Sequence, residues 1–201
     1  MMRLCLPVTI ALAVSVLGGC ASPKAAFYTL SPEARRDSTS SGAPVTVVIR
    51  PVSVPELIDR PQMVVRAGDN QVTIEEYARW ADPLRSQIPR VVAADLGIVL
   101  DSTLVSVNPV GVDPAAAWRV QIDVQRFDAT LGEAATVDVL WSVTPPGNGS
   151  PLTGRTRASE RCSGPGYDAL VAAYSRALAT VSGDIAAAIH PAAVMRKAPS
   201  S

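Results

Sequence analysis

Few side chains in this sequence of 201 residues could perform chemistry. Its one histidine, His190, is expected in the last turn of the final helix, where the helix dipole favours a cation without any catalytic role. Glu75 and Glu76 are adjacent, so on a strand their carboxylates point to opposite faces. The sequence contains no Gly-x-Ser-x-Gly motif, glycine-rich phosphate loop or cysteine–histidine cluster with metal spacing. It therefore predicts no enzyme, no catalytic residue and no metal site.

Cys20 has the neighbourhood of a thiol that is modified rather than buried. A single basic residue, Arg3, precedes an apolar stretch over residues 4–17. This stretch is shorter than the about 20 residues that a helix needs to cross a bilayer. The small residues Gly18-Gly19 then lead directly to Cys20. This order is typical of a secretory signal peptide, which we expect over residues 1–19.

The segment Leu17-Gly18-Gly19-Cys20 resembles the lipobox of bacterial lipoproteins. The resemblance implies that Cys20 carries S-diacylglycerol and N-acyl groups, with no other cofactor, after the signal peptide is removed. An ordinary cleaved signal with a chance cysteine is the alternative. Each buried CH₂ contributes about 0.8 kcal/mol, so two or three acyl chains would anchor the protein stably. Ala21 stands where Asp favours inner-membrane retention in such lipoproteins, which implies an outer-membrane location facing the periplasm.

Composition and local patterns divide the rest of the chain. The 18 basic and 18 acidic residues balance, so no electrostatic footprint for nucleic acid exists. Residues 20–43 are rich in Ser, Pro and Ala and predict a lipidated, flexible tether. Within it, residues 26–30 form a short β-type run that either pairs as an edge strand or lies against the domain. Residues 44–194 predict one domain, and residues 195–201 a disordered tail.

Cys162 is the one thiol left after the other two cysteines are removed or acylated. It cannot form an internal disulfide, and we expect a small, partly buried hydrophobic residue.

Hydrophobic periodicity within the domain predicts an α+β fold. Expected strands cover residues 45–52, two segments around the turn at 67–70, and residues 118–125, 135–143 and 152–161. Asp82 should cap a helix that begins at Pro83, and Pro89 should kink or restart it. A long amphipathic helix follows from Tyr167 to Ile189. Because strands are joined by hairpins, we expect a mixed or antiparallel sheet with two main helices packed on one face.

Three stretches together resemble a known family. They are "FYTL" at 27–30, "PVSVPELIDRPQMVVR" at 51–66 and "YARWADPL" at 77–84. They are similar to the PqiC-like transport auxiliary lipoproteins that accompany MCE-type lipid transporters. The resemblance implies an outer-membrane lipoprotein that contacts an MCE-domain protein of the inner membrane and supports envelope integrity. The resemblance also implies contact with outer-membrane lipids through the anchor, and an oligomeric partner leaves a ring-like homo-oligomer open.

These stretches contain the candidate docking residues, which we call the docking motif: Asp59, Arg60, Pro61, Gln62, Arg66 and Trp80. Pro61 restricts Arg60 to an extended conformation, so the loop either docks a partner or is a structural turn. Trp80 is either a hydrophobic anchor over the helix start or an interface hot spot.

Arg155, Arg157 and Arg161 share one parity of the last expected strand and form a basic stripe. It is either a solvated face or a contact for anionic lipid headgroups or an acidic partner. Two other functions stay open at this stage. One is a carrier module that shelters a lipid, and the other is a structural or regulatory lipoprotein acting on a cell-wall synthesis enzyme.

Overall fold

A computed structural model describes residues 24–35, 45–113, 115–147 and 149–197, with side chains as far as His190. Cys20, the signal peptide and the rest of the expected tether lie outside these residues, as does the chain after Lys197. The strands are β1 (Ala26–Tyr28), β2 (Val47–Ile49), β3 (Gln62–Arg66), β4 (Val72–Trp80), β5 (Val105–Ser106), β6 (Trp118–Thr130), β7 (Ala134–Thr144) and β8 (Leu152–Arg161). The helices are the short 3₁₀ helix η2 (Glu56–Ile58), α2 (Leu84–Val99) and α3 (Tyr167–Lys197).

The strands form two mixed sheets, so the predicted α+β class is confirmed. The larger sheet has the order β5-β2-β6-β7-β8, and the smaller one has the order β1-β4-β3. Strands β6, β7 and β8 form the expected antiparallel meander, whereas β2 pairs parallel to both β5 and β6. In the smaller sheet β3 and β4 form the predicted hairpin, and β1 joins β4 in parallel.

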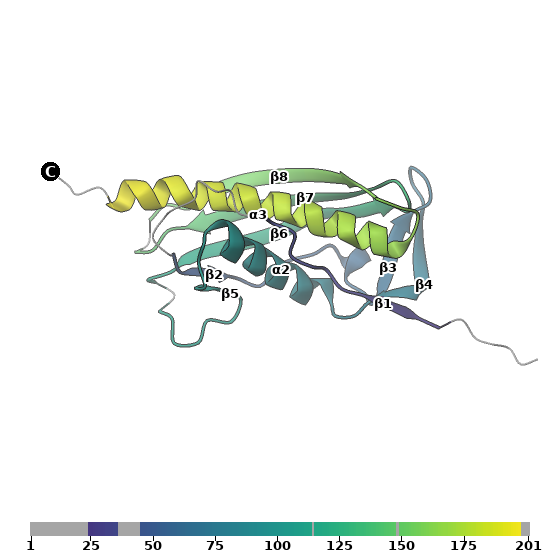
Figure 1. The fold of residues 1–201 in the computed structure, drawn as a ribbon, viewed down its shortest axis with the longest axis horizontal. Coiled ribbons are helices and arrows are strands. Elements are labelled where there is room, and N and C mark those ends of the chain that lie inside the picture. Colours follow the sequence, from purple (N-terminus) through teal and green to yellow (C-terminus); the bar gives the residue numbers. More distant parts are fainter. Residues whose placement is uncertain (1–23, 36–44, 114, 148, 198–201) are drawn as a thin grey trace, which may run out of the picture.

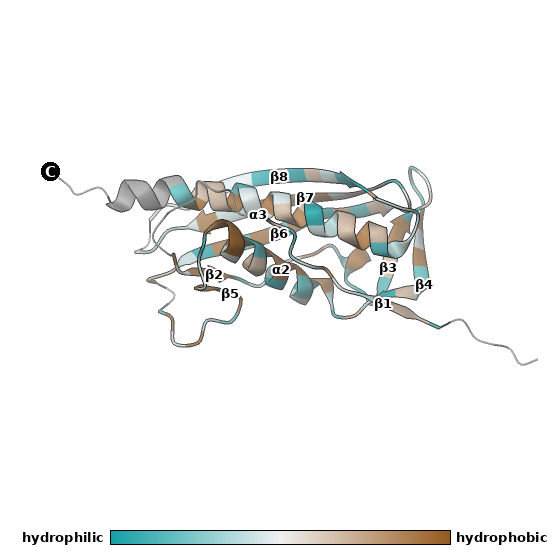
Figure 2. Ribbon diagram, viewed as in Figure 1, coloured by the Kyte–Doolittle hydropathy of each residue, from teal (hydrophilic) through white to brown (hydrophobic). Residues whose placement is uncertain are grey.

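Both helices cover one side of the larger sheet (Figure 1). α3 packs along β7 and β8, and α2 packs against α3. Hydrophobic and hydrophilic positions alternate along α3 and the strands in Figure 2, as expected for elements that bury one face. The core contains the predicted inward residues of β6 and α3, among them Val120, Ile122, Leu178 and Ile185.

β6 continues beyond the expected residue 125 to Thr130, past a bulge between Val124 and Arg126. A bulge shifts the alternation of side chains by one residue. Phe127 and Ala129 are therefore buried beyond it, where the uninterrupted pattern would have turned them outward. Asp128 faces outward for the same reason.

Residues 24–35 belong to the folded body and not to a flexible tether. β1 is an edge strand, and the segment after it, residues 29–35, which we call the N-terminal strap, crosses α2 and α3. The Leu30 amide donates to Gln87 Oε1 at 2.8 Å. The Glu33 and Ala34 amides both donate to Asp95 Oδ1 at 2.9 Å. These buried acceptors fix the strap, because an unpaired buried amide would be costly.

Three details of the predicted helices are wrong. Pro83 and not Asp82 occupies the N-cap, without a side-chain cap, since the Asp82 carboxylate binds Arg90 instead. α2 includes Pro89 and is one element from Leu84 to Val99, so the helix does not restart at Pro89. α3 extends past His190 to Lys197, so that His190 is not in its last turn and the first residues of the expected tail are helical.

Candidate docking site

The three family-like stretches meet at one end of the molecule, although they are separated in sequence. The Trp80 amide donates to the Pro61 carbonyl at 2.7 Å, and the Ala81 amide donates to the Tyr28 carbonyl at 2.8 Å. Together with the parallel pairing of β1 with β4, these bonds join the YARWADPL stretch to both other stretches. The site is thus built on backbone hydrogen bonds between rigid elements.

A surface pocket of about 480 Å³ lies at this junction. We call it the motif pocket. Its lining comes from β1, the η2–β3 loop and the β4–α2 connection: Phe27, Asp59, Arg60, Pro61, Trp80, Ala81, Asp82, Pro83 and Arg85. Apolar surface from the rings of Phe27, Pro61 and Pro83 lies beside charged groups. Such a combination suits a binding partner with both an apolar and a charged group.

The charges around the motif pocket are unevenly paired. Arg85 Nε donates to Asp59 Oδ1 at 3.0 Å, and Arg90 pairs with Asp82 at 2.5 Å. Arg60 forms no ion pair with a described residue, and its buried Nε has no hydrogen-bond partner among them. A buried guanidinium nitrogen without an acceptor is unfavourable, so an incoming acceptor would stabilise it.

Trp80 is buried beneath the motif pocket and acts as a hydrophobic anchor. It is 5% exposed and makes edge-on contacts with Phe127 at 6.1 Å and Tyr174 at 6.2 Å between ring centroids. Phe127 and Tyr174 stack at 3.8 Å, and burial raises the pKa of Tyr174 well above its usual value. The indole therefore holds β4 against the core, and its burial is opposed to the hot-spot interpretation.

The docking motif does not stay together along β3. Gln62 begins β3 next to Pro61 and is half-buried. Arg66 ends it, and its Nε and NH2 groups donate to Asp128 at 3.1 Å. Arg66 also donates to the Asp69 carbonyl at 2.9 Å, which fixes the β3–β4 turn. Of the predicted docking residues, Arg66 thus has a local structural partner and lies away from the motif pocket.

The basic stripe is largely neutralised by a buried carboxylate that sequence inspection did not connect with it. Asp138 of β7 is 0% exposed, and Arg155 and Arg157 of β8 each bind it at 2.8 Å. The hydrogen bond from Arg155 and the charge of both arginines lower the pKa of Asp138 to about 2. Arg161 is exposed at the end of β8. Two of the three stripe residues therefore stabilise the sheet.

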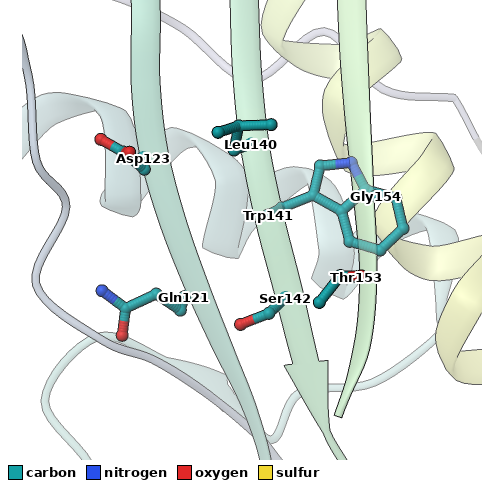
Figure 3. Close-up of a pocket in the computed structure, with 7 residues that line it drawn as sticks. All are labelled: Gln121, Asp123, Leu140, Trp141, Ser142, Thr153 and Gly154. Atoms are coloured by element: carbon teal, nitrogen blue, oxygen red, sulfur yellow. The ribbon is translucent and has the colours of Figure 1, made fainter.

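A second surface pocket, of about 420 Å³, lies on the larger sheet (Figure 3). Gln121 and Asp123 of β6 and Leu140 and Ser142 of β7 line it. The Trp141 ring lies against β8 at Gly154, its partner in register, and its Nε1 donates to Thr156 Oγ1 at 3.0 Å. None of the predicted docking residues lines this pocket.

Sequence reasoning missed Phe27 and Arg85 as members of the motif pocket. Phe27 belonged to the quoted FYTL stretch, so the signal for it was present. Arg85 directly follows the YARWADPL stretch, and its pairing with Asp59 depends on how α2 begins, which no short pattern encodes.

Comparison with known proteins identifies the family. The family model for "ABC-type transport auxiliary lipoprotein component" matches residues 28–186 of the chain. The chain belongs to this family. No curated protein matches. The matched region contains the whole of the motif pocket except Phe27, which directly precedes it.

Two solved structures share the fold of this transport auxiliary lipoprotein. One is a crystal structure of an uncharacterized protein, with a TM-score of 0.68 and 22% sequence identity. The match covers 83% of this chain and 99% of the chain in that crystal structure. The other is protein XCC0632 from Xanthomonas campestris, of family DUF330, with a TM-score of 0.66 and 18% identity over 81% and 93% of the two chains. Within the described residues, no helix is long and apolar enough to cross a membrane.

Proposed function

We propose that this transport auxiliary lipoprotein is a non-catalytic accessory of an MCE-type lipid transport system. In this proposal Cys20 is acylated and anchors the protein in the outer membrane, with the body in the periplasm. The body docks to the MCE-domain protein of the inner membrane through the motif pocket and so supports envelope integrity. A ring-like assembly of several copies is compatible with an oligomeric partner.

One observation supports docking above all others: three stretches distant in sequence form a single pocket. Backbone bonds from Trp80 and Ala81 join these stretches, and the Trp80 ring fixes them to the core. Preorganised sites of this kind bind with less loss of conformational entropy than flexible loops. The pocket is therefore suited to recognition rather than to a purely structural turn.

The chemistry of the pocket suggests what the partner offers. Asp59 and Asp82 already have arginine partners, whereas the Arg60 Nε lacks an acceptor among the described residues. A carboxylate next to an apolar side chain would bind Arg60 and cover the Pro61 and Pro83 rings at the same time. We therefore expect an acidic side chain flanked by apolar residues on the docking segment of the MCE protein.

Co-purification from native envelopes tests the docking. The acylated Arg60→Ala variant should capture at least about tenfold less MCE protein than the wild type. This difference corresponds to the loss of one charge-assisted contact of about 1.4 kcal/mol. Arg161→Ala is the control, since it removes the same side chain from β8, outside the motif pocket. Equal capture by both variants would place docking elsewhere.

Metabolic labelling tests the anchor separately. Labelled fatty acid should enter the wild-type protein and not a Cys20→Ala variant. Label in both forms, or in neither, would contradict acylation at Cys20.

A further inference from the structure

Large apolar side chains are exposed at the β1 end of the body, where the chain that follows Cys20 joins the fold. Phe27 of β1 is 65% exposed, and Tyr77 of β4 is 52% exposed. Phe27 is paired in register with Arg79, and Tyr77 lies two residues earlier on the same strand. Ala78 and Trp80 of β4 are buried whereas Tyr77 and Arg79 are not, so the Tyr77 ring and the Phe27 ring, opposite Arg79, share the outward face of the smaller sheet. Val72 and Ile74, also on β4, are 38% and 39% exposed.

The length of chain between Cys20 and β1 limits where this face can lie. Lys24, the first described residue, is the fourth residue after Cys20, and a fully extended chain spans at most about 3.5 Å per residue. Lys24 therefore lies within about 14 Å of the Cys20 Cα, and Phe27 within about 25 Å. No longer excursion is possible, whatever conformation the intervening residues adopt.

The shape of the body makes this limit informative. β1, β3 and β4 lie at one end, and the C-terminal end of α3 lies at the other (Figure 1). The 31 residues of α3 span about 46 Å at 1.5 Å per residue. An anchor at Cys20 thus keeps the β1 end close to the bilayer surface, whatever the tilt of the body.

We infer that Phe27 and Tyr77 form a second membrane contact, seated in the lipid interface beside the acylated Cys20. This inference rests on the proposed acylation. Aromatic rings, above all those with a polar tip such as Tyr77, favour the boundary between headgroups and acyl chains. The exposed Lys24 adds a cation that anionic headgroups attract. The contact fixes the orientation of the body and keeps the motif pocket, which Phe27 also lines, next to the membrane surface.

Quenching by brominated lipids tests the contact in the full acylated protein, reconstituted in vesicles of phosphatidylethanolamine and phosphatidylglycerol brominated near the headgroup end of the acyl chain. A Phe27→Trp variant adds one reporter to the native tryptophans. Val110→Trp is the matched control, because Val110 is 94% exposed in the segment between β5 and β6, away from β1. The fluorescence of the extra tryptophan is the difference between the variant and the wild type. At position 27 this fluorescence should be quenched at least threefold more than at position 110. Equal quenching at both positions would overturn the inference.

A lengthened connection separates true contact from mere proximity. About ten Gly and Ser residues inserted between Pro23 and Lys24 add reach without changing the body. If the aromatic face itself binds lipid, quenching at position 27 persists in this variant and falls when Tyr77→Ser is added. Loss of quenching on insertion alone would overturn the contact. So would quenching that appears only where copies crosslink through position 27, because the face would then bind a second copy.

Mass spectrometry of the same sample keeps the two proposals distinguishable. Acylated protein without quenching at position 27 would overturn the membrane contact and leave the proposed function intact. Unacylated protein would overturn both.

Discussion

Asp138 offers the sharpest test of the energetics, because its carboxylate is buried while both of its arginine partners are exposed. Arg155 and Arg157 lower its pKa from 3.8 to about 2, and one pKa unit corresponds to about 1.4 kcal/mol. Full expression of this shift would contribute about 2.5 kcal/mol to the free energy of unfolding. The arginine side chains are 57% and 60% exposed, so solvent screening should reduce the contribution to about 1.5 kcal/mol.

The substitution Asp138→Asn removes the charge at nearly constant shape. At pH 7 it should lower the free energy of unfolding by about 1.5 kcal/mol, which moves the urea midpoint by about 0.7 M for a slope of about 2 kcal/mol/M. The folded pKa lies below the unfolded one, so this stabilisation is present above pH 3.8 and is lost as the pH falls towards 2. The difference between wild type and variant should therefore shrink over that range.

Urea titrations followed by far-ultraviolet circular dichroism at pH 7 and at pH 2.5 measure both quantities. Asp69→Asn is the control, since Asp69 is exposed in the β3–β4 turn and Arg66 binds its carbonyl rather than its carboxylate. It should shift the midpoint by less than about 0.25 M at pH 7. A gap between wild type and Asp138→Asn that is as wide at pH 2.5 as at pH 7 would refute the ion-pair reasoning.

Three further substitutions test other parts of the fold. Gly154→Ala places a Cβ inside the Trp141 ring and should lower the free energy of unfolding by about 2–3 kcal/mol in urea titrations, whereas Gly166→Ala, whose Cβ meets nothing within 4 Å, should change it little. Asp95→Ala leaves the Glu33 and Ala34 amides without their acceptor, so limited trypsin digestion should cut at Arg35 faster than in wild type. Trp80→Ala removes a buried ring and should lower the thermal midpoint by at least about 8 °C, from a loss of about 3–5 kcal/mol; a smaller loss than Trp141→Ala would argue against its anchoring role.

Local pattern was sufficient for the elements with the clearest periodicity. Strict alternation from Trp118 to Val124 predicted β6, and helical spacing from Tyr167 to Ile189 predicted most of α3, because burial of one face dominates both elements. The alternation could not reveal the bulge after Val124, since a bulge inserts one residue without a fixed composition. The continuation of α3 past Pro191 was missed because proline usually ends a helix.

The candidate site depended on contacts that no local pattern contains. The family-like stretches could be recognised singly, but their convergence follows from the parallel pairing of β1 with β4. Asp138 occupies a solvent-facing parity, and only the arginines folded over it make it buried. Likewise, the strap is held by hydrogen bonds from its backbone amides to Gln87, Asp95 and Ser175, which lie far along the chain from the strap.

The N-terminal strap has a mechanical consequence. A pull arriving through residue 24 meets β1 first, where it acts along the strand and loads its bonds to β4 together in shear. Beyond β1, the force passes to both helices through Gln87 and Asp95 of α2 and Ser175 of α3. Tension between two separated structures would thus be shared across the scaffold and would not unzip the fold from its first strand.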